Sequence, residues 1–158
     1  MATLRQAIEI LALAPVLSAD GAEPIAISGN FVVPAGLALN DVIELAPLPA
    51  GYVPLDVTLD AEDADSGGSP AVVFDVGLIS GDFGVVDNTR VCGADFIAAS
   101  TVAQAGGIAR MAAMGATRIA PTTNDRGVGV KVKVAAATLV AGAKMTLTLW
   151  CRPAINGA

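Results

Sequence analysis

Apolar and polar residues alternate with a period of two in several stretches of the chain. The alternation runs through residues 53–60 (VPLDVTLD), 71–80 (AVVFDVGLIS), 127–138 (GVGVKVKVAAAT) and 144–153 (KMTLTLWCRP). In a β-strand, successive side chains point to opposite faces of the sheet, so this pattern predicts strands with one covered face. Sheets with one covered face must stack on each other, which favours a β-sandwich.

Weaker strand patterns extend this prediction along the rest of the chain. They lie at residues 24–28 (PIAIS), 41–47 (DVIELAP), 108–114 (IARMAAM) and 116–121 (ATRIAP), between turns rich in Gly, Pro, Asn and Asp. About eight short strands of this kind predict an all-β, jelly-roll-like sandwich.

One segment departs from the period of two. In residues 93–107 (GADFIAASTVAQAGG), Asp95 is placed to cap a helix that would end at Gly106 and Gly107. We therefore expect one short helix here, covering one end of the sandwich.

The first 24 residues are predicted to be an N-terminal arm, and residues 25–158 the sandwich domain. Leu4, Ile8 and Leu11 follow helical spacing, which predicts an amphipathic helix over residues 3–13 that docks on a partner. The alternative is that the arm covers an open edge of its own sandwich. Glu9 and Pro15 interrupt the apolar stretch of the arm, so we expect neither an export signal nor a membrane anchor.

Composition argues against several classes of function. The chain has nine Lys and Arg residues against 15 Asp and Glu, with a net charge of −6, and so lacks the basic surface that nucleic acids require. It has no histidine, which removes the usual general base and zinc ligand. No uninterrupted apolar stretch is long enough to span a membrane. We expect a protein that is not an enzyme, needs no cofactor, and contacts neither nucleic acid nor membrane.

The balance of apolar and charged residues suggests contacts between subunits. Hydrophobic residues make up 54% of the chain and charged residues only 15%. A surface with so little charge favours a homodimer or homo-oligomer, although a monomer with many exposed alanines remains an alternative. Cys92 and Cys151 are predicted to be buried free thiols, with a disulfide as the alternative.

The run DAEDADSGGSP holds four carboxylates, those of Asp60, Glu62, Asp63 and Asp65, between two predicted strands. Its spacing imitates the start of a calcium loop, but the acidic residue that should complete the loop is absent. Paired catalytic carboxylates would need two different environments, which one exposed turn does not offer. We therefore predict a solvated acidic turn here, with no metal site and no catalytic residue, and calcium binding is the alternative.

Two other local features have structural interpretations. The glycines of GDFG (residues 81–84) and of the pair Gly127 and Gly129 are predicted to form turns. Lys131 and Lys133 are predicted to be solvated charges or to protect a sheet edge, with contact to an acidic partner as an alternative.

The order of these segments resembles a known family. The run LPAGYVPLDVTLDAEDADSGGSPAVVFDVGLISGDFG, followed by DFIAASTVAQAGGIAR and RGVGVKVKVAAATLVAGAKMTLTLW, is similar to head cement or decoration proteins of tailed bacteriophages. The resemblance covers roughly residues 45–150 and implies a jelly-roll sandwich with a structural role. It implies binding to the major capsid protein on the exterior of the virion, after synthesis in the host cytoplasm, and offers no catalytic residues.

The residues that would contact a partner are drawn from the predicted arm and one strand. Leu4, Ile8 and Leu11 would contact it from the arm, and Trp150 from the outward face of the last strand. The alternatives are a phage tail or fibre subunit, or a glycan-binding sandwich module in which exposed aromatic residues such as Trp150 would line the site.

Overall fold

The computed structural model describes residues 4–6 and 23–154 of the chain. The strands are β1 (Leu4–Gln6), β2 (Ile25–Val32), β3 (Val42–Leu48), β4 (Tyr52–Ala61), β5 (Val73–Asp82), β6 (Ile97–Ser100), β7 (Gly107–Arg110), β8 (Arg126–Val134) and β9 (Lys144–Pro153). Two 3₁₀ turns, η2 (Val102–Gln104) and η3 (Ala116–Arg118), are the helical elements of the described part. No helix among the described residues is long and apolar enough to cross a bilayer.

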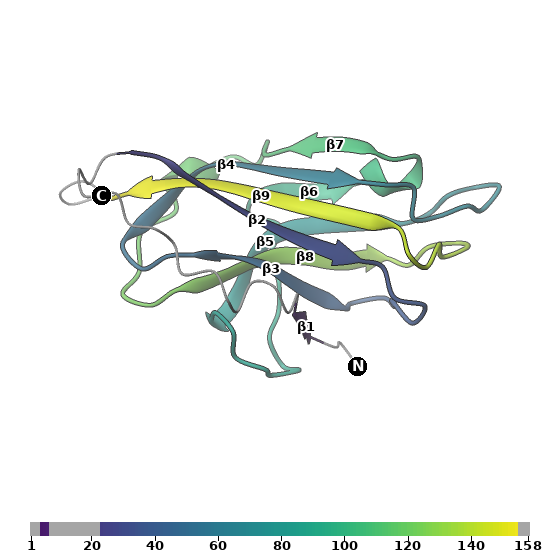
Figure 1. Ribbon diagram of the computed structural model, residues 1–158, viewed down its shortest axis with the longest axis horizontal. Coiled ribbons are helices and arrows are strands. Elements are labelled where there is room, and N and C mark those ends of the chain that lie inside the picture. The colour runs from purple at the N-terminus through teal and green to yellow at the C-terminus, as the bar shows by residue number, and fades with distance from the viewer. Residues whose placement is uncertain (1–3, 7–22, 155–158) are drawn as a thin grey trace.

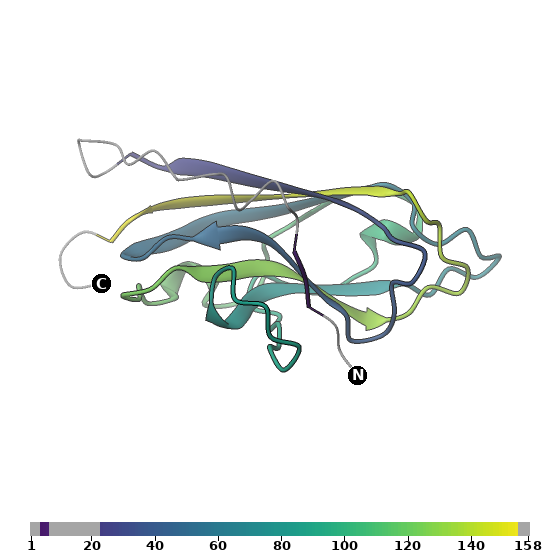
Figure 2. The same cartoon turned by 60° about the horizontal axis from the view of Figure 1, so that its bottom comes forward.

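The strands form two stacked sheets, as predicted (Figure 1). One sheet has the order β1-β3-β8-β5-β6, and the other has the order β2-β9-β4-β7. Without the three-residue β1, each sheet has four strands, and all of their pairings are antiparallel. Figure 2 shows the two layers running side by side along the long axis of the molecule. The fold is an all-β, jelly-roll-like sandwich.

The core lies between the sheets and follows from the alternating pattern of the strands. Phe74 and Val130, from the larger sheet, and Leu59, Leu147 and Leu149, from the smaller sheet, are fully buried. The polar residues between them face outward because successive side chains of a strand alternate. This confirms most of the inward-facing residues expected for the strongest strands, but Val134, expected to face inward at the end of β8, is 41% exposed.

The regular alternation fails in β4 at Leu55, which was expected to face inward with Val53 but is 36% exposed. The pairing of β4 with β9 shifts register between Pro54 and Asp56, as at a β-bulge. A bulge adds one residue to one strand and so reverses the faces of the residues around it.

The short helix expected between Asp95 and Gly107 is absent. Residues Ile97–Ser100 form β6, and only Val102–Gln104 make a 3₁₀ turn. Asp95 does not cap a helix, because its carboxylate accepts a hydrogen bond from Leu78 N–H at 2.9 Å. Pairing of β6 with β5 outweighs the local helical preference of an alanine-rich segment.

Three further expectations were wrong. Residues Ala116–Arg118 form a 3₁₀ turn, not the strand expected in ATRIAP. Gly127 and Gly129 lie inside β8 and not in a turn. Of the two roles expected for Lys131 and Lys133, edge protection is wrong, because β8 pairs with β3 on one side and β5 on the other, whereas the Lys133 side chain is solvated as the other role requires, at 46% exposure. Lys133 Nζ instead lies 3.4 Å from Asp75 Oδ1.

Candidate functional site

The loop that joins β5 to β6, residues 83–96, lies over the outer face of the larger sheet. Two glycines of that face leave room for the groups above them, Gly77 for the loop and Gly127 for the Glu44 side chain of β3. A Cβ atom on Gly77 would collide with the backbone carbonyl of Gly93, and one on Gly127 would collide with Glu44 Oε1. We call residues 83–96 the β5–β6 loop.

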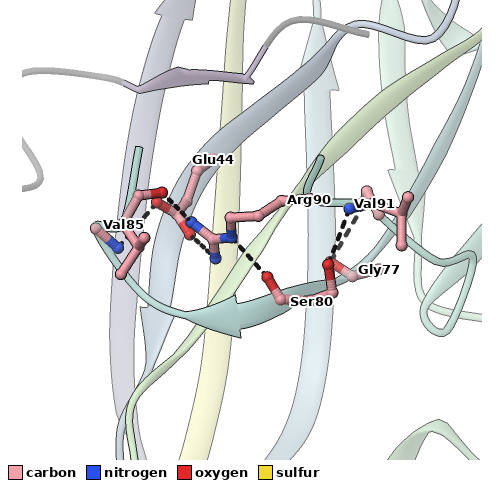
Figure 3. A network of polar contacts seen from close by, with 8 residues as sticks. Glu44, Gly77, Ser80, Val85, Arg90 and Val91 are labelled. Atoms are coloured by element: carbon pink, nitrogen blue, oxygen red, sulfur yellow. Dashed lines mark hydrogen bonds and ion pairs between the residues drawn. The ribbon is translucent and has the colours of Figure 1, made fainter. Parts of the chain in front are cut away.

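A buried ion pair fixes this loop to the sheet (Figure 3). Arg90 comes from the loop and Glu44 from β3, and their side chains are 4% and 1% exposed. Arg90 Nη2 donates to Glu44 Oε1 at 2.8 Å, while Arg90 Nε and Nη1 donate to the carbonyls of Ser80 and Val85 at 2.5 and 2.7 Å. The guanidinium therefore joins β3, the end of β5 and the loop.

Other hydrogen bonds hold the two ends of the loop to the sheet. Gly84 N–H donates to Glu44 Oε2 at 3.1 Å. Ser80 and Val91 bond twice, with Ser80 N–H donating to the Val91 carbonyl and Val91 N–H donating to Ser80 Oγ, each at 2.9 Å. The loop is thus anchored on both sides of its tip.

The anchored loop presents apolar side chains to solvent. Val85, Val86 and Val91 are 49%, 76% and 63% exposed. Between them, Asp87 accepts hydrogen bonds from the backbone N–H and hydroxyl of Thr89 at 2.8 and 2.7 Å, which tightens the tip. Exposed aliphatic side chains held on a rigid loop are suited to packing against another protein, because little conformational entropy is lost on binding.

Cys92 belongs to the β5–β6 loop, and its buried side chain packs with Val42 and Ile79 in a small cluster outside the main core. Burial raises the pKa of the Cys92 thiol to about 12, and burial also raises the pKa of Cys151 to about 12. Both cysteines are free, which confirms the prediction of buried thiols. Thiols with such high pKa values are protonated and unreactive near neutral pH.

The acidic run between β4 and β5 is not only a solvated turn. Asp65 is 0% exposed, and its carboxylate accepts five backbone N–H groups, those of Gly67, Ala71, Val72, Ala137 and Thr138. Burial by itself raises the pKa of Asp65, but the hydrogen bonds from Ala71, Thr138, Ala137 and Val72 outweigh it and hold the pKa well below its ordinary value. Asp65 therefore ties the β4–β5 connection to the β8–β9 connection.

The other acidic residues of the run do not share a common partner. Glu62 Oε2 accepts Lys144 N–H at 2.8 Å, Asp63 Oδ1 accepts Asp65 N–H at 2.9 Å, and Asp60 is exposed on β4. Among the described residues, no group of three or more His, Cys, Asp or Glu side chains is arranged to hold a metal ion. Both Asp65 oxygens accept hydrogen bonds from backbone N–H groups, so this carboxylate serves the fold of the turn.

Trp150 lies on the outward face of β9 and is 43% exposed, as predicted. On one side it pairs with Ala26 of β2, and on the other with Asp56 of β4. Asp56 forms a surface ion pair with Arg110 at 2.6 Å. The indole is accessible on the outward face of the smaller sheet.

Of the three arm residues predicted to contact a partner, the structure describes only Leu4. Leu4 lies in β1, which pairs in parallel with β3 opposite Val42, and not in the amphipathic helix expected for residues 3–13. This pairing corresponds to the alternative in which the arm covers an edge of its own sandwich. Ile8 and Leu11 lie outside the described residues.

A shallow hollow at the end of the sandwich has little catalytic potential. Of its lining residues only Asp95 is ionisable, and its carboxylate accepts the Leu78 N–H. General acid–base catalysis needs groups with different proton affinities near one another, which this hollow does not provide. The lining residues are Ala94, Asp95, Ala113, Met114, Gly115, Ala116 and Ile119.

Sequence reasoning did not identify the Arg90–Glu44 pair or the role of Asp65. A signal for Glu44 was present, because it is a lone charge in the otherwise uncharged strand VIELAPL. Glu44 and Arg90 are 46 residues apart in the sequence, and Asp65 and Thr138 are 73 residues apart. Local spacing carries no information about such distant pairs.

The chain is similar to proteins in two solved phage capsid structures. It is 38% identical to a chain in the capsid of Ralstonia phage GP4, with a TM-score of 0.89, over 97% of this chain and 99% of that chain. It is 25% identical to a chain in the capsid asymmetric unit of cyanophage Pam1, with a TM-score of 0.66, over 89% and 93% of the two chains. No protein-family model and no curated protein matches the chain.

Proposed function

Because the chain belongs to a family of phage capsid proteins, we propose that it binds the outer surface of a phage capsid and cements neighbouring major capsid subunits. The observation that carries the proposal is its similarity, along nearly the whole of both chains, to a chain in the capsid of Ralstonia phage GP4. A small sandwich of 158 residues with a net charge of −6 is suited to a protein contact and poorly suited to holding packaged DNA.

Cementing requires many copies of a modest contact rather than one strong site. When each copy touches more than one capsid subunit, the second contact forms at a high effective concentration. A rigid domain meets this requirement because its contact surfaces keep a fixed distance from each other. The anchoring of the β5–β6 loop by Arg90 and Glu44 gives such rigidity.

In this proposal the protein acts on the virion exterior after synthesis in the host cytoplasm, as a homodimer or homo-oligomer without catalytic activity. The contacts with the major capsid protein come from the exposed valines of the β5–β6 loop, from Trp150, and from the arm through Leu4, Ile8 and Leu11. In this proposal the arm is residues 1–24 and the sandwich domain is residues 25–158, with β1 of the arm paired to β3 of the sandwich. The valine loop is supported by its exposure and its anchoring.

The experiment is co-sedimentation of the purified protein with capsids that lack it. The proposal expects saturation at a fixed ratio to the major capsid protein, and a higher temperature for release of packaged DNA once the protein has bound. Capsids whose thermal stability does not change on binding would contradict the cementing role, and absence of binding would contradict the proposal as a whole.

Two matched variants locate the contact. Val86→Asp places a charge on the β5–β6 loop, and Ile108→Asp places the same charge at a 70% exposed site on β7 of the other sheet. We expect V86D to weaken capsid binding about tenfold or more, since one desolvated charge costs over 1.4 kcal/mol. Equal effects of the two variants would argue against the loop as the contact.

A further inference from the structure

Among the residues that the structure describes, strand β2 is an open edge of the smaller sheet and lacks the usual protection. Its eight residues pair with β9 without a break in register, from Ile25 opposite Cys151 to Val32 opposite Lys144. Proteins protect edge strands with charges, prolines, bulges or short length, but Ile25–Val32 contains no charged residue, no proline and no bulge. The other described edge strands, β1, β6 and β7, are only three or four residues long.

The hydrogen bonds of Val33, the residue directly after β2, show which backbone N–H and C=O groups of the strand point toward β9. Val33 N–H donates to the Ala143 carbonyl, and Gly142 N–H donates to the Val33 carbonyl, each at 2.8 Å, so the groups of Val33 face β9. In an antiparallel ladder this direction alternates along the strand. The N–H and C=O groups of residues 26, 28, 30 and 32 therefore face the open edge, and no described residue pairs with them.

We propose that β2 pairs antiparallel with β2 of a second copy of this chain, joining two four-stranded sheets into one of eight strands. The two-fold axis would place Gly29 opposite Gly29. Ser28 then faces Asn30 and Ala26 faces Val32, so every outward N–H and C=O group of residues 26 to 32 finds a partner in the other copy. Moving the axis to Ser28 would place Val32 opposite Pro24, which has no N–H to donate.

The side chains of β2 are compatible with this pairing. Val32 is 57% exposed in the single chain and would be covered by the partner's Ala26. Phe31 is partly buried at the margin of the core and would meet the partner's Ile27 on the inner face. Each copy carries a net charge of −6, and the uncharged sequence of β2 keeps like charges away from the seam.

The inference rests on the self-association included in the proposed function, but it can be measured without capsids. Ser28→Pro removes one outward N–H and leaves the bonds between β2 and β9 in place, and proline is tolerated where the N–H faces outward on an edge strand. Ser28→Ala is the matched variant, because both substitutions remove the hydroxyl that lies 2.9 Å from Thr148 Oγ1 while only S28P removes the N–H.

Sedimentation equilibrium over a concentration series measures self-association of the wild type and both variants. We expect the wild type to dimerise, and S28A to dimerise about tenfold or more tightly than S28P, because each dimer of S28P lacks two hydrogen bonds and carries two prolines at the seam. Thermal unfolding at a concentration where all three proteins are monomeric checks that S28P is folded.

A disulfide trap tests the register. Ser28→Cys with Asn30→Cys places cysteines on facing residues, whose Cα atoms in a hydrogen-bonded antiparallel pair are about 5.5 Å apart, within the range of a disulfide. Ala26→Cys with Asn30→Cys would face each other only if the axis passed through Ser28. We expect oxidation to give covalent dimers with the first pair and not with the second.

Three other outcomes of the self-association and capsid-binding measurements would each contradict one part of the two proposals. A wild type that stays monomeric, with S28P binding capsids like S28A, shows that the edge has no strand partner. A monomeric wild type whose capsid binding is lost only in S28P shows that the edge takes a strand of another capsid protein, and overturns the second copy as the occupant. A dimer that binds no capsid leaves the pairing intact and contradicts the proposed function.

Discussion

Arg90 Nη2 and Glu44 Oε1 lie 2.8 Å apart in a nearly solvent-free position on the outer face of the larger sheet. This contact joins residues that are 46 positions apart in the sequence. It also explains two other features of the fold, the course of the β5–β6 loop and the glycine at position 127, whose missing side chain leaves room for Glu44.

Arg90→Met is expected to destabilise the protein by about 3–5 kcal/mol, because it leaves the Glu44 carboxylate buried without a cation. Urea unfolding followed by Trp150 fluorescence measures the loss. Replacing both residues by methionine should recover most of the stability, since an apolar pair leaves no uncompensated charge. Arg110→Met removes the exposed partner of Asp56 and should have a much smaller effect.

Gly127→Ala is expected to cost at least about 1–3 kcal/mol, because the new Cβ atom would overlap Glu44 Oε1 and displace the ion pair. Gly36→Ala is the control, since a Cβ atom at position 36 would have no heavy atom within 4 Å beyond its chain neighbours. G36A should stay within about 0.5 kcal/mol of the wild type in the same unfolding assay. Equal stability of the two variants would mean that Glu44 does not occupy the space above Gly127.

Asp65→Asn is expected to lower the unfolding temperature strongly, because an amide nitrogen cannot accept the N–H groups that the carboxylate accepts. Asp60→Asn, at an exposed site of the same acidic run, should have little effect.

The contribution of Asp65 also depends on pH. Its pKa is lowered in the folded state, so its stabilising effect is fully present above the unfolded-state pKa of about 3.9 and is lost as the pH falls toward the folded-state pKa. The difference in stability between wild type and D65N should therefore be constant from neutral pH to about pH 5 and shrink below pH 4. A difference that grows on acidification would contradict this assignment.

Cys92 and Cys151 are expected to resist thiol reagents in the folded protein at pH 8, because both pKa values are raised to about 12 by burial. Both thiols should react once urea unfolds the chain, which a colorimetric thiol assay measures. Rapid labelling of Cys92 alone in the native protein would show that the β5–β6 loop opens, since Cys92 is a residue of that loop and its side chain is buried against Val42 and Ile79.

The alternating pattern of residues 53–60, 71–80, 127–134 and 144–153 was sufficient to predict the strands, the inward-facing residues and the sandwich. A period of two reports directly which side chains face the core, and in β4 it fails at Leu55, where a bulge intervenes. The short helix expected after Asp95 was wrong because local preference carries less free energy than pairing of β6 with β5.

The sequence by itself determined the fold class, favoured buried thiols over a disulfide, and showed an acidic chain without the imidazole groups of histidine. Only the tertiary structure decided which charges are buried, how the β5–β6 loop is held, and which edge is left open. Arg90 meets Glu44, and Asp65 meets Thr138, only after the sheets have formed. Hydrophobic periodicity is a local property of the chain, whereas these contacts depend on the order of strands within each sheet.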